Sequence, residues 1–456
     1  MNIRSYLSGT IGLRLIDVAR KTRTCDVLKE LKRTEFSSIA ELEALQFDKL
    51  KGLLVHCKEN VPFYQRLFRD CNFDPLEMTT VSELEQLPVL TKDIIRNNFE
   101  QLKARNFHQF RPRIKETGGS TGQPLRLYHD ENSHGTMWGN IYRGFGHAGY
   151  QPGDKYLTIA GGSLLPKKLK FGRFLYFWLQ NSPVVPSYYL AKGYSQELAG
   201  LINKKKPKYI YGYSSSIYQF SKYLQESEVR IDCLDAVFTT ADMLYPQQRK
   251  VIEEVLGAPV FDNYGCPEAG VMTWECEQHD GYHYNMESCF LEILDRDSNG
   301  AGRVISTNLA NYAFPIVRYD TDDIASLEHA GKCQCGRSHS KIKSLIGRQR
   351  DIITLPCGSM LHGAFFNHFP SFYDNDRISR YQIVQTEPEE IEVHIEPVKG
   401  CKLEELNYVR DELMKAIGNE VRIKLIKGEF RESSISRKHR VVISDVDNIW
   451  TREMPN

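Results

Sequence analysis

Apolar residues recur at helical spacing in the first hundred residues. Within Leu50–Cys57 they fall at i, i+3, i+4 and i+7, which predicts one buried face of a helix. That helix must end before Val61-Pro62, because proline disfavours helical backbone in the residue that precedes it. Thr80 and Glu83 have the spacing of a capping box at the start of a further helix. We therefore expect residues 1–105 to be mainly helical.

The middle of the chain alternates between short apolar runs and an amphipathic segment. Ala236–Thr240 and Pro259–Tyr264 are expected to be buried strands, and Gln247–Leu256 a helix with Pro246 at its start and Gly257 after its end. A strand, a helix and a strand in this order predict a right-handed crossover in a parallel sheet. Ligands bind beyond the carboxyl ends of such strands, where Thr240–Asp242 and Tyr264–Glu268 follow.

The pattern changes to antiparallel strands at about Phe290. Phe290–Leu294 and Arg303–Thr307 flank the turn residues Asp295–Gly302 and predict a hairpin. Ile316–Asp323 continues as extended chain, and Gly347–Asp351 reads as a junction.

Beyond that junction the pattern predicts a small α+β unit. Its expected elements are the strands Tyr381–Gln385, Glu390–Ile395 and Val421–Ile426 and a helix over Leu403–Ile417. The fold class is therefore α/β, with a large domain over residues 1–350 and a small C-terminal domain over residues 351–456.

Composition and charge narrow the functional classes. The 456 residues are enough for two or three domains, and 41% hydrophobic with 26% charged residues is typical of a globular protein. Lys and Arg total 59 against 58 Asp and Glu, a formal net charge of +1. This balance argues against a nucleic-acid or membrane-surface binder, because both need a basic excess.

Three observations favour the cytoplasm. No segment approaches the roughly 18 uninterrupted apolar residues of a spanning helix, so no integral membrane association is expected. Met1–Arg20 is interrupted by Arg14 and Asp17 and lacks a cleavage site; it reads as an amphipathic surface helix, with a peripheral membrane role as the weaker alternative. The 11 cysteines are odd in number and scattered, which disfavours a disulfide framework and favours a reducing compartment.

Glu116–Pro124 is the most distinctive segment for function. Its glycines let backbone N–H groups approach anionic oxygens, and its hydroxyl side chains add donors. It is not a Walker loop, because no lysine follows the last glycine, and an ordinary surface loop is the competing interpretation. The candidate phosphate-binding residues are Thr117, Gly118, Gly119, Ser120, Thr121 and Gly122.

The string resembles the signature of adenylate-forming enzymes, and the chain is similar to the phenylacetate–coenzyme A ligase family, including relatives in capsular polysaccharide biosynthesis. The resemblance runs nearly end to end, and it rests on segments in the family's order. These are Val61–Tyr64, Leu87–Lys92, Thr117–Pro124, Tyr264–Glu268, Pro315–Ile324 and Gly347–Asp351. It implies a fold with a large adenylation domain and a C-terminal lid.

The resemblance also implies a role for each matched residue. The Thr117–Gly122 loop would hold the β- and γ-phosphates, and Glu268 would hold Mg²⁺. Tyr264 would pack near the adenine, Asp323 would accept hydrogen bonds from the ribose, and Arg348 would pair with the nucleotide. The nearby strand-end residues Asp242 and Gly265 are assigned to ATP as well.

Two departures from the family are visible. Asp322 stands where the family usually has glycine, which adds a carboxylate beside Asp323 and puts the affinity for ATP in question. The lid's Gly-Lys pair is matched by Arg437-Lys438, so Lys438 is the candidate adenylation lysine.

Structural alternatives compete with these assignments. Lys438 could belong to a solvated basic run, Glu268 could cap the following helix, and Arg318 could form a surface ion pair with Asp323.

Cysteine spacing suggests a metal centre. Cys333 and Cys335, together with Cys276 and His283, would suit a closed tetrahedral Cys₃His zinc site, and the resemblance implies a structural zinc at matching positions. His279 is the rival nitrogen ligand, and four unmetallated residues are the alternative. Cys266 and Cys289 are expected in the core.

We therefore expect ATP-dependent conversion of a carboxylic acid to its acyl-adenylate with Mg²⁺. The acyl group would pass to coenzyme A or to an amine or hydroxyl acceptor, such as a sugar intermediate of surface polysaccharide. The alternative is a zinc-stabilised binding or assembly protein that kept the fold without turnover. A homodimer is a further hypothesis; the acid, the acceptor and the pathway stay open.

Overall fold

The computed structural model describes residues 3–116, 125–160, 171–186, 195–329, 331–357, 360–362, 365–366, 369–373, 377–418, 420–431, 440–448 and 450–451. The predicted phosphate loop and Lys438 lie outside these residues. Among the described helices, none combines the length and the apolar character needed to cross a bilayer.

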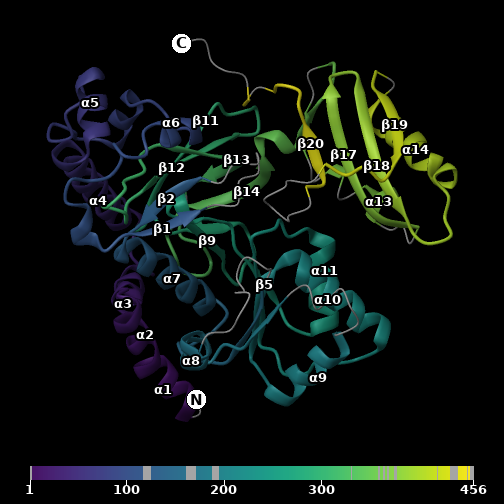
Figure 1. The fold of residues 1–456 in the computed structure, drawn as a ribbon, viewed down its shortest axis with the longest axis horizontal. Coiled ribbons are helices and arrows are strands. Elements are labelled where there is room, and N and C mark those ends of the chain that lie inside the picture. The colour runs from purple at the N-terminus through teal and green to yellow at the C-terminus, as the bar shows by residue number, and fades with distance from the viewer. Residues whose placement is uncertain are drawn as a thin grey trace.

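Helices cover one side of the large domain, as the periodicity predicts (Figure 1). α4 (Ile39–Asn60) begins at a capping box of Ser38 and Glu41 and ends at Val61, where α5 (Pro62–Asp70) starts with its proline. Thr80 and Glu83 do form a capping box, but it opens a 3₁₀ turn, η2 (Val81–Gln86), rather than an α-helix. α6 (Lys92–Asn97) follows.

A five-stranded parallel sheet lies at the centre of the α/β part. The order is β4 (Val184–Pro186), β3 (Tyr156–Ala160), β5 (Tyr209–Tyr213), β6 (Ala236–Thr240) and β7 (Val260–Asp262). The predicted crossover from β6 through α11 (Pro246–Leu256) to β7 is confirmed, with Gly257 in the left-handed conformation after the helix (φ 63°).

Helices cover both faces of this sheet. Val237 points into a core shared with α9 (Ser195–Lys205), α10 (Ser214–Ser227) and α11. Its neighbour Phe238 points to the other face, which packs against α7 (Glu131–Gly146). Successive side chains of β6 therefore point into two different hydrophobic cores, as expected for a strand in a parallel sheet with helices on both faces.

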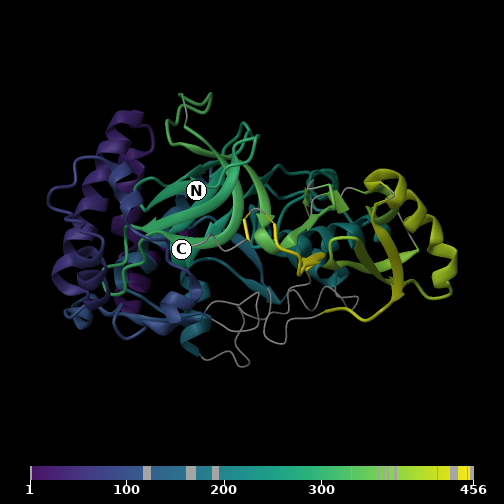
Figure 2. The ribbon, with the colours of Figure 1, turned by 90° about the horizontal axis from the view of Figure 1, so that it is seen from above.

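A seven-stranded, largely antiparallel sheet joins the helices to the α/β part (Figure 2). Its order is β11 (Cys289–Leu294), β12 (Ala301–Asn308), β13 (Tyr319–Glu328), β14 (Lys341–Arg348), β10 (Tyr282–Tyr284), β9 (Val271–Glu275) and β8 (Gly265–Cys266). The predicted hairpin is confirmed, with Phe290 opposite Thr307 and Leu294 opposite Arg303.

The C-terminal unit is a four-stranded sheet covered by a helix. Its order is β19 (Arg422–Lys427), β18 (Glu390–Pro397), β17 (Ile378–Glu387) and β20 (Val442–Ser444), with α14 (Asn407–Ile417) packed on it. The short pair β15 (Ile352–Thr354) and β16 (Met360–His362) links it to the larger part. After β20 the chain returns to the seven-stranded sheet, where Trp450 is buried with Ala301 and Ile324.

Candidate active site and metal centre

β13 and β14 bring the predicted nucleotide-binding residues together. Asp323 pairs directly with Arg348 in the strand register, and its Oδ1 lies 3.8 Å from the Arg348 guanidinium. The hydroxyl of Tyr264, which follows β7, donates to Oδ2 of Asp323 at 2.8 Å. Three residues that are far apart in the sequence thus meet at one end of the β13–β14 hairpin.

The Asp323 carboxyl is perturbed by this setting. Burial raises its pKa to about 6, while Arg348 and the Tyr264 hydroxyl act in the opposite direction. A buried carboxylate with one cation and one donor has acceptor capacity left for further hydroxyl groups. The side chain is thus equipped to accept hydrogen bonds from a polar ligand.

Glu268 lies close to this cluster without a partner of its own. It belongs to a single 3₁₀ turn, η5 (Pro267–Ala269). This turn directly follows β8, the short strand that contains Gly265. Its half-buried carboxylate has no hydrogen bond or ion pair with any residue that the structure describes. The expected alternative, capping of a following helix, is wrong, because the strand β9 and not a helix follows this turn.

The end of β6 approaches the same region. Ser215 donates to Oδ2 of Asp242 at 2.6 Å, so the start of α10 fixes this carboxylate. Met243 beside it lies against Gly347, with the sulfur 3.9 Å from where a β-carbon would stand. Asp242 is therefore one residue from Met243, which lies against the Gly347 end of β14; its role toward a nucleotide stays a prediction.

Asp322 does not compete with Asp323 for the same space. Its carboxylate forms an ion pair with Lys92, at the start of α6. Its backbone is left-handed (φ 64°), a conformation that favours glycine and that aspartate tolerates better than most residues. The left-handed backbone thus explains why the related family usually has glycine at this position and why aspartate can occupy it in this chain.

The predicted junction is marked by a second ion pair. Asp351 ends η6 (Gln349–Asp351), and Nε of Arg440 lies 2.9 Å from its Oδ1. Arg440 is the first described residue after the segment that carries Lys438. Arg440 is therefore attached to the junction.

A Cys/His cluster lies at the opposite end of the β13–β14 hairpin. Sγ of Cys276 is 4.0 Å from Sγ of Cys333, and Sγ of Cys335 is 3.4 Å from Nε2 of His283. All four potential ligand atoms lie within 4.8 Å of one another. Zinc–sulfur bonds of about 2.3 Å in tetrahedral geometry separate two sulfurs by about 3.8 Å, so the cluster fits zinc.

The thiols of Cys333 and Cys335 are carried by a tight turn, residues 333–337, which we call the knuckle. Gly336 N–H donates to the carbonyl of Cys333 at 2.8 Å, and Cys333 N–H donates to the carbonyl of Arg337 at 2.9 Å. Gly336 has φ 87°, which a larger residue would adopt only with strain. The Arg337 side chain binds Glu35, which attaches the turn to the N-terminal helices.

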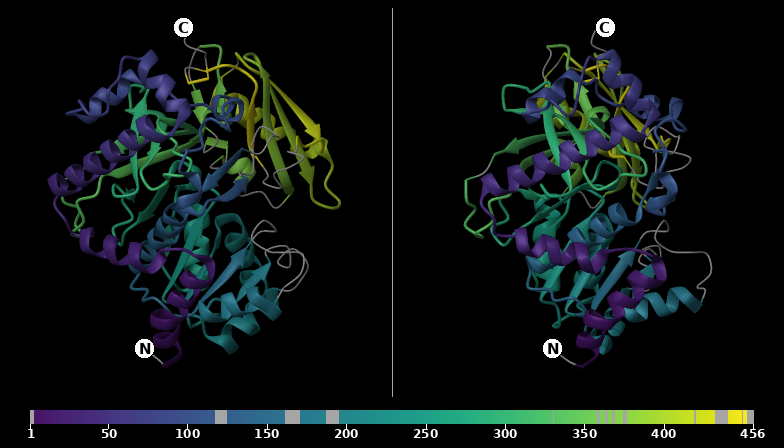
Figure 3. Two further views of the ribbon diagram at one scale, coloured as in Figure 1. Left: turned by 60° about the vertical axis from the view of Figure 1, so that its left-hand side comes forward. Right: turned by 90° about the vertical axis from the view of Figure 1, so that its left-hand side faces the viewer.

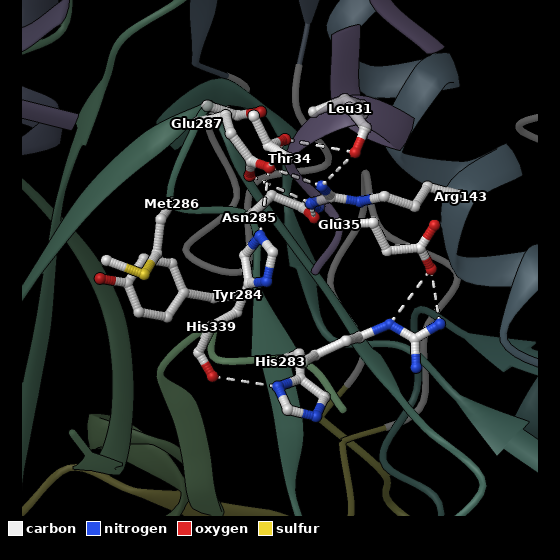
Figure 4. Close-up of polar contacts among 12 residues, drawn as sticks. Leu31, Thr34, Glu35, Arg143, His283, Tyr284, Asn285, Met286, Glu287 and His339 are labelled. Atoms are coloured by element: carbon white, nitrogen blue, oxygen red, sulfur yellow. Dashed lines mark hydrogen bonds and ion pairs between the residues drawn. The ribbon is translucent and has the colours of Figure 1, made fainter. Parts of the chain in front are cut away.

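Outer contacts orient the imidazole. Nδ1 of His283 lies 3.0 Å from the carbonyl oxygen of His339 (Figure 4). If Nδ1 carries the proton and donates it to this carbonyl, the unprotonated Nε2 of His283 can bind a metal. Nε2 of His339 in turn lies 3.1 Å from Oε1 of Glu287. The rival ligand His279 is excluded from the cluster, since its Nδ1 faces Glu275 at 3.2 Å.

Glu287 is the centre of a buried charge network. It accepts from Arg143 on α7 at 2.7 and 3.1 Å and from Thr34 on α3 (Thr24–Thr34) at 2.5 Å (Figure 4). Burial alone would raise its pKa, but Arg143 and His339 hold that pKa well below the usual range. The network ties the cysteine-histidine cluster to two helices.

Sequence reasoning missed this network and the Lys92–Asp322 pair, and it misassigned one arginine. Arg143 and Glu287 are 144 positions apart and carry no motif. Arg318 does not pair with Asp323 on the surface; it binds Glu292 at 2.8 Å in a buried pair. Cys266 and Cys289 are buried, as predicted.

Comparison with known proteins identifies homologues over most of the chain. The chain is 25% identical to Protein CapK of Staphylococcus aureus over 376 residues, which cover 80% of each chain. It is 27% identical to a phenylacetate-coenzyme A ligase of Escherichia coli over 345 residues, 72% of this chain and 75% of that one. The chain is a homologue of these proteins. No family model matches it.

Solved structures give the same fold. A 2-hydroxyisobutyryl-CoA ligase in the postadenylation state superposes with a TM-score of 0.70 at 19% identity, over 91% of this chain and 92% of that one. The same ligase in its thioesterification state gives 0.57. The adenylate-forming fold is therefore confirmed, and the relatives confirm the prediction of an adenylate-forming ligase.

Proposed function

We propose that this protein uses ATP and Mg²⁺ to convert a carboxylic acid to its acyl-adenylate and then transfers the acyl group to an acceptor. The observation that supports this most is the convergence of Tyr264, Asp323 and Arg348 beside Glu268, whose carboxylate has no partner in the described part of the chain. These residues match the family's motifs in identity and order.

Each residue has a distinct task in this proposal. Asp323 accepts hydrogen bonds from the ribose, and Arg348 remains close enough to balance its charge. Glu268 provides the free carboxylate that a hard cation such as Mg²⁺ prefers, and the bound cation would offset charge on the leaving pyrophosphate. Tyr264 borders the adenine, while Asp242 and Gly265 line the same strand ends.

The remaining charge comes from segments outside the described residues. Backbone N–H groups of Thr117–Gly122 hold the β- and γ-phosphates, and Lys438 brings a cation to the α-phosphate and the acid. Charge that develops during attack on phosphorus is stabilised best by groups held in place beforehand. The Asp351–Arg440 pair supports this proposal, because it places Arg440, two residues after Lys438 in the sequence, at the junction.

Coenzyme A is the acceptor that the ligase relatives favour, since several carry it in their names. An amine or hydroxyl on a sugar intermediate is the acceptor that the capsule branch of the resemblance suggests, and the CapK relative is consistent with it. The alternative of a non-catalytic binding protein receives no support from these relatives.

We assign a structural zinc ion to Cys276, His283, Cys333 and Cys335. Four protein ligands leave no open coordination position, so this ion would hold the knuckle in place and take no part in the reaction.

The decisive experiment is acid-dependent pyrophosphate release from ATP and Mg²⁺, measured over a panel of carboxylic acids. At least one acid should raise the rate well above the acid-free reaction, and coenzyme A or an amino sugar added next should consume the adenylate. ATP binding with no release for any acid would favour the non-catalytic alternative.

A further inference from the structure

The N-terminal helical segment buries Leu13 and Ile16 but leaves a second apolar stripe exposed. α1 (Ile3–Leu7), the π-helical turn η1 (Ser8–Gly12) and α2 (Leu13–Arg20) run along the margin of the large domain, away from the C-terminal unit (Figures 1 and 3). In a surface helix of a globular protein the apolar stripe normally faces the core. Here the exposed stripe consists of Ile3, Leu7, Ile11, Leu15 and Val18, which are 80, 47, 52, 50 and 77% exposed.

Close backbone contacts fix this orientation. Small residues, Ser5, Ser8 and Gly12, lie on the buried side. A β-carbon on Gly9 would lie 1.9 Å from the carbonyl oxygen of Pro152, and one on Gly12 would lie 2.6 Å from that of Leu179. The segment cannot rotate its aliphatic stripe inward without separating these backbones.

Basic side chains flank the stripe, and the segment itself has no exposed acid; the next exposed acid along the chain is Asp26, on α3. Arg4, Arg14, Arg20 and Lys21 are all exposed. The one acidic residue of this segment, Asp17, is buried and accepts from Thr22 at 2.6 Å and from the backbone of Cys25 at 2.8 Å. The near-neutral charge of the whole chain, which argued against a membrane-surface protein, conceals this local excess.

A second helix extends the same surface. α8 (Phe171–Leu179) exposes Leu175 by 41% and Trp178 by 51%. The Arg4 guanidinium lies 5.5 Å from the centre of the Trp178 ring, so the two helices present their exposed residues side by side. Tryptophan beside arginine is typical of the boundary between headgroups and acyl chains.

We propose that this surface docks the protein onto an anionic membrane. The aliphatic side chains would enter the boundary between headgroups and acyl chains, while the arginines would contact lipid phosphates. Amphipathic helices that lie at a membrane interface bind in this way. A second copy is a poor occupant, because a twofold contact would bring two sets of uncompensated arginines together. The proposal is independent of adenylation, whose residues lie at the β13–β14 hairpin.

The test is co-sedimentation of the full chain with vesicles. The probe is phosphatidylcholine mixed with phosphatidylglycerol, and vesicles of phosphatidylcholine alone are the reference. The wild type should bind the anionic vesicles, more weakly at high salt, and Leu7→Ser/Ile11→Ser/Val18→Ser should reduce the partition at least about tenfold. Arg4→Glu/Arg14→Glu should abolish the preference for anionic lipid.

A matched control removes exposed apolar residues elsewhere, in Leu76→Ser/Leu201→Ser/Tyr408→Ser, and should bind like the wild type. Unfolding temperature and pyrophosphate release, measured on every variant, should stay at wild-type values. Equal loss in the control, or no binding by the wild type, would overturn the proposal. A wild-type dimer that the apolar variant converts to monomer, without vesicle binding, would assign the surface to a second copy.

Discussion

The two ends of the β13–β14 hairpin differ in how far their polar groups are satisfied. At the open end, the carboxylate of Glu268 has no partner among the described residues, and burial raises the pKa of Asp323 to about 6. At the loop end, His283, His339, Glu287 and Arg143 form a continuous chain of contacts. The same pair of strands therefore ends in a site where Glu268 has no partner among the described residues and in a connected network where only Nδ1 of His339 lacks one.

This difference indicates different roles. Unpaired buried charge costs stability and is retained where a ligand supplies the missing partner. A satisfied network holds elements together and specifies their positions. Substitutions at the open end should therefore affect catalysis more than folding, and substitutions at the loop end should do the reverse.

The largest effect on catalysis is expected at the lid. Lys438→Ala should slow adenylation by about 10²-fold or more, because a preorganised positive charge is lost. Lys424→Ala, in β19 of the same unit, is the matched control and should retain the wild-type rate. Single-turnover acyl-adenylate formation measures both; a wild-type rate for the Lys438 variant would reject its role.

Glu268→Gln should slow the same step by about 10²-fold, because the neutral amide binds Mg²⁺ weakly. Its unfolding temperature should match the wild type, since Glu268 contributes no contact that the fold needs. Raising the Mg²⁺ concentration should recover part of the rate. An unchanged rate at low Mg²⁺ would contradict the assignment.

Removal of the metal tests the structural role of the cysteine-histidine cluster at the loop end of the β13–β14 hairpin. Purified protein should contain about one equivalent of zinc, and chelation or Cys335→Ser should lower the unfolding temperature markedly. Cys266→Ser, a buried cysteine outside the cluster, is the control that should keep its zinc. Less than about half an equivalent, with no change in stability on chelation, would remove the ion from the protein.

Asp323→Asn should separate stability from binding through pH. A raised pKa means that the folded wild type holds this proton more tightly than the unfolded chain does, so its stability falls as pH rises from about 4 to about 6. Asparagine has no such cost, and the variant's relative stability should rise over this window. Nucleotide affinity should fall meanwhile; melting curves and ATP titrations measure the two.

Asp322→Gly should have the smallest effect. Glycine adopts the left-handed backbone of this position without strain, and the Lys92 pair it removes is partly exposed. We expect an affinity for ATP within a few-fold of wild type. A large gain on substitution would show that the extra carboxylate does repel the triphosphate.

Local patterns predicted the local structure well. The β6–α11–β7 crossover, the β11–β12 hairpin and the order β17, β18, α14, β19 follow from periodicity, proline and glycine alone. Motif identity selected Tyr264, Asp323 and Arg348, which the fold brings together, and the cysteine pattern with the family resemblance selected four residues that cluster, with His279 left as a rival to His283.

Long-range partners were not predictable in this way. No sequence pattern near Glu287 indicates that Arg143 is its partner. The sequence around Arg318 likewise does not indicate whether Glu292 or Asp323 is its partner. The exposed stripe of the N-terminal helix was equally hidden, because a helical period gives the position of an apolar face but not its direction. Direction depends on glycine contacts with Pro152 and Leu179 that only the folded chain brings about.

The return of the chain after β20 constrains motion of the C-terminal unit. That unit is joined to the rest at Asp351 and again at Trp450, whose indole donates to the carbonyl of Asp295 at 2.9 Å. A body held at two points turns freely only about the line between them. Any larger swing would have to pull the indole into water, at a cost of about 2–3 kcal/mol, and the Trp450 contact would thereby limit how far the C-terminal unit can move.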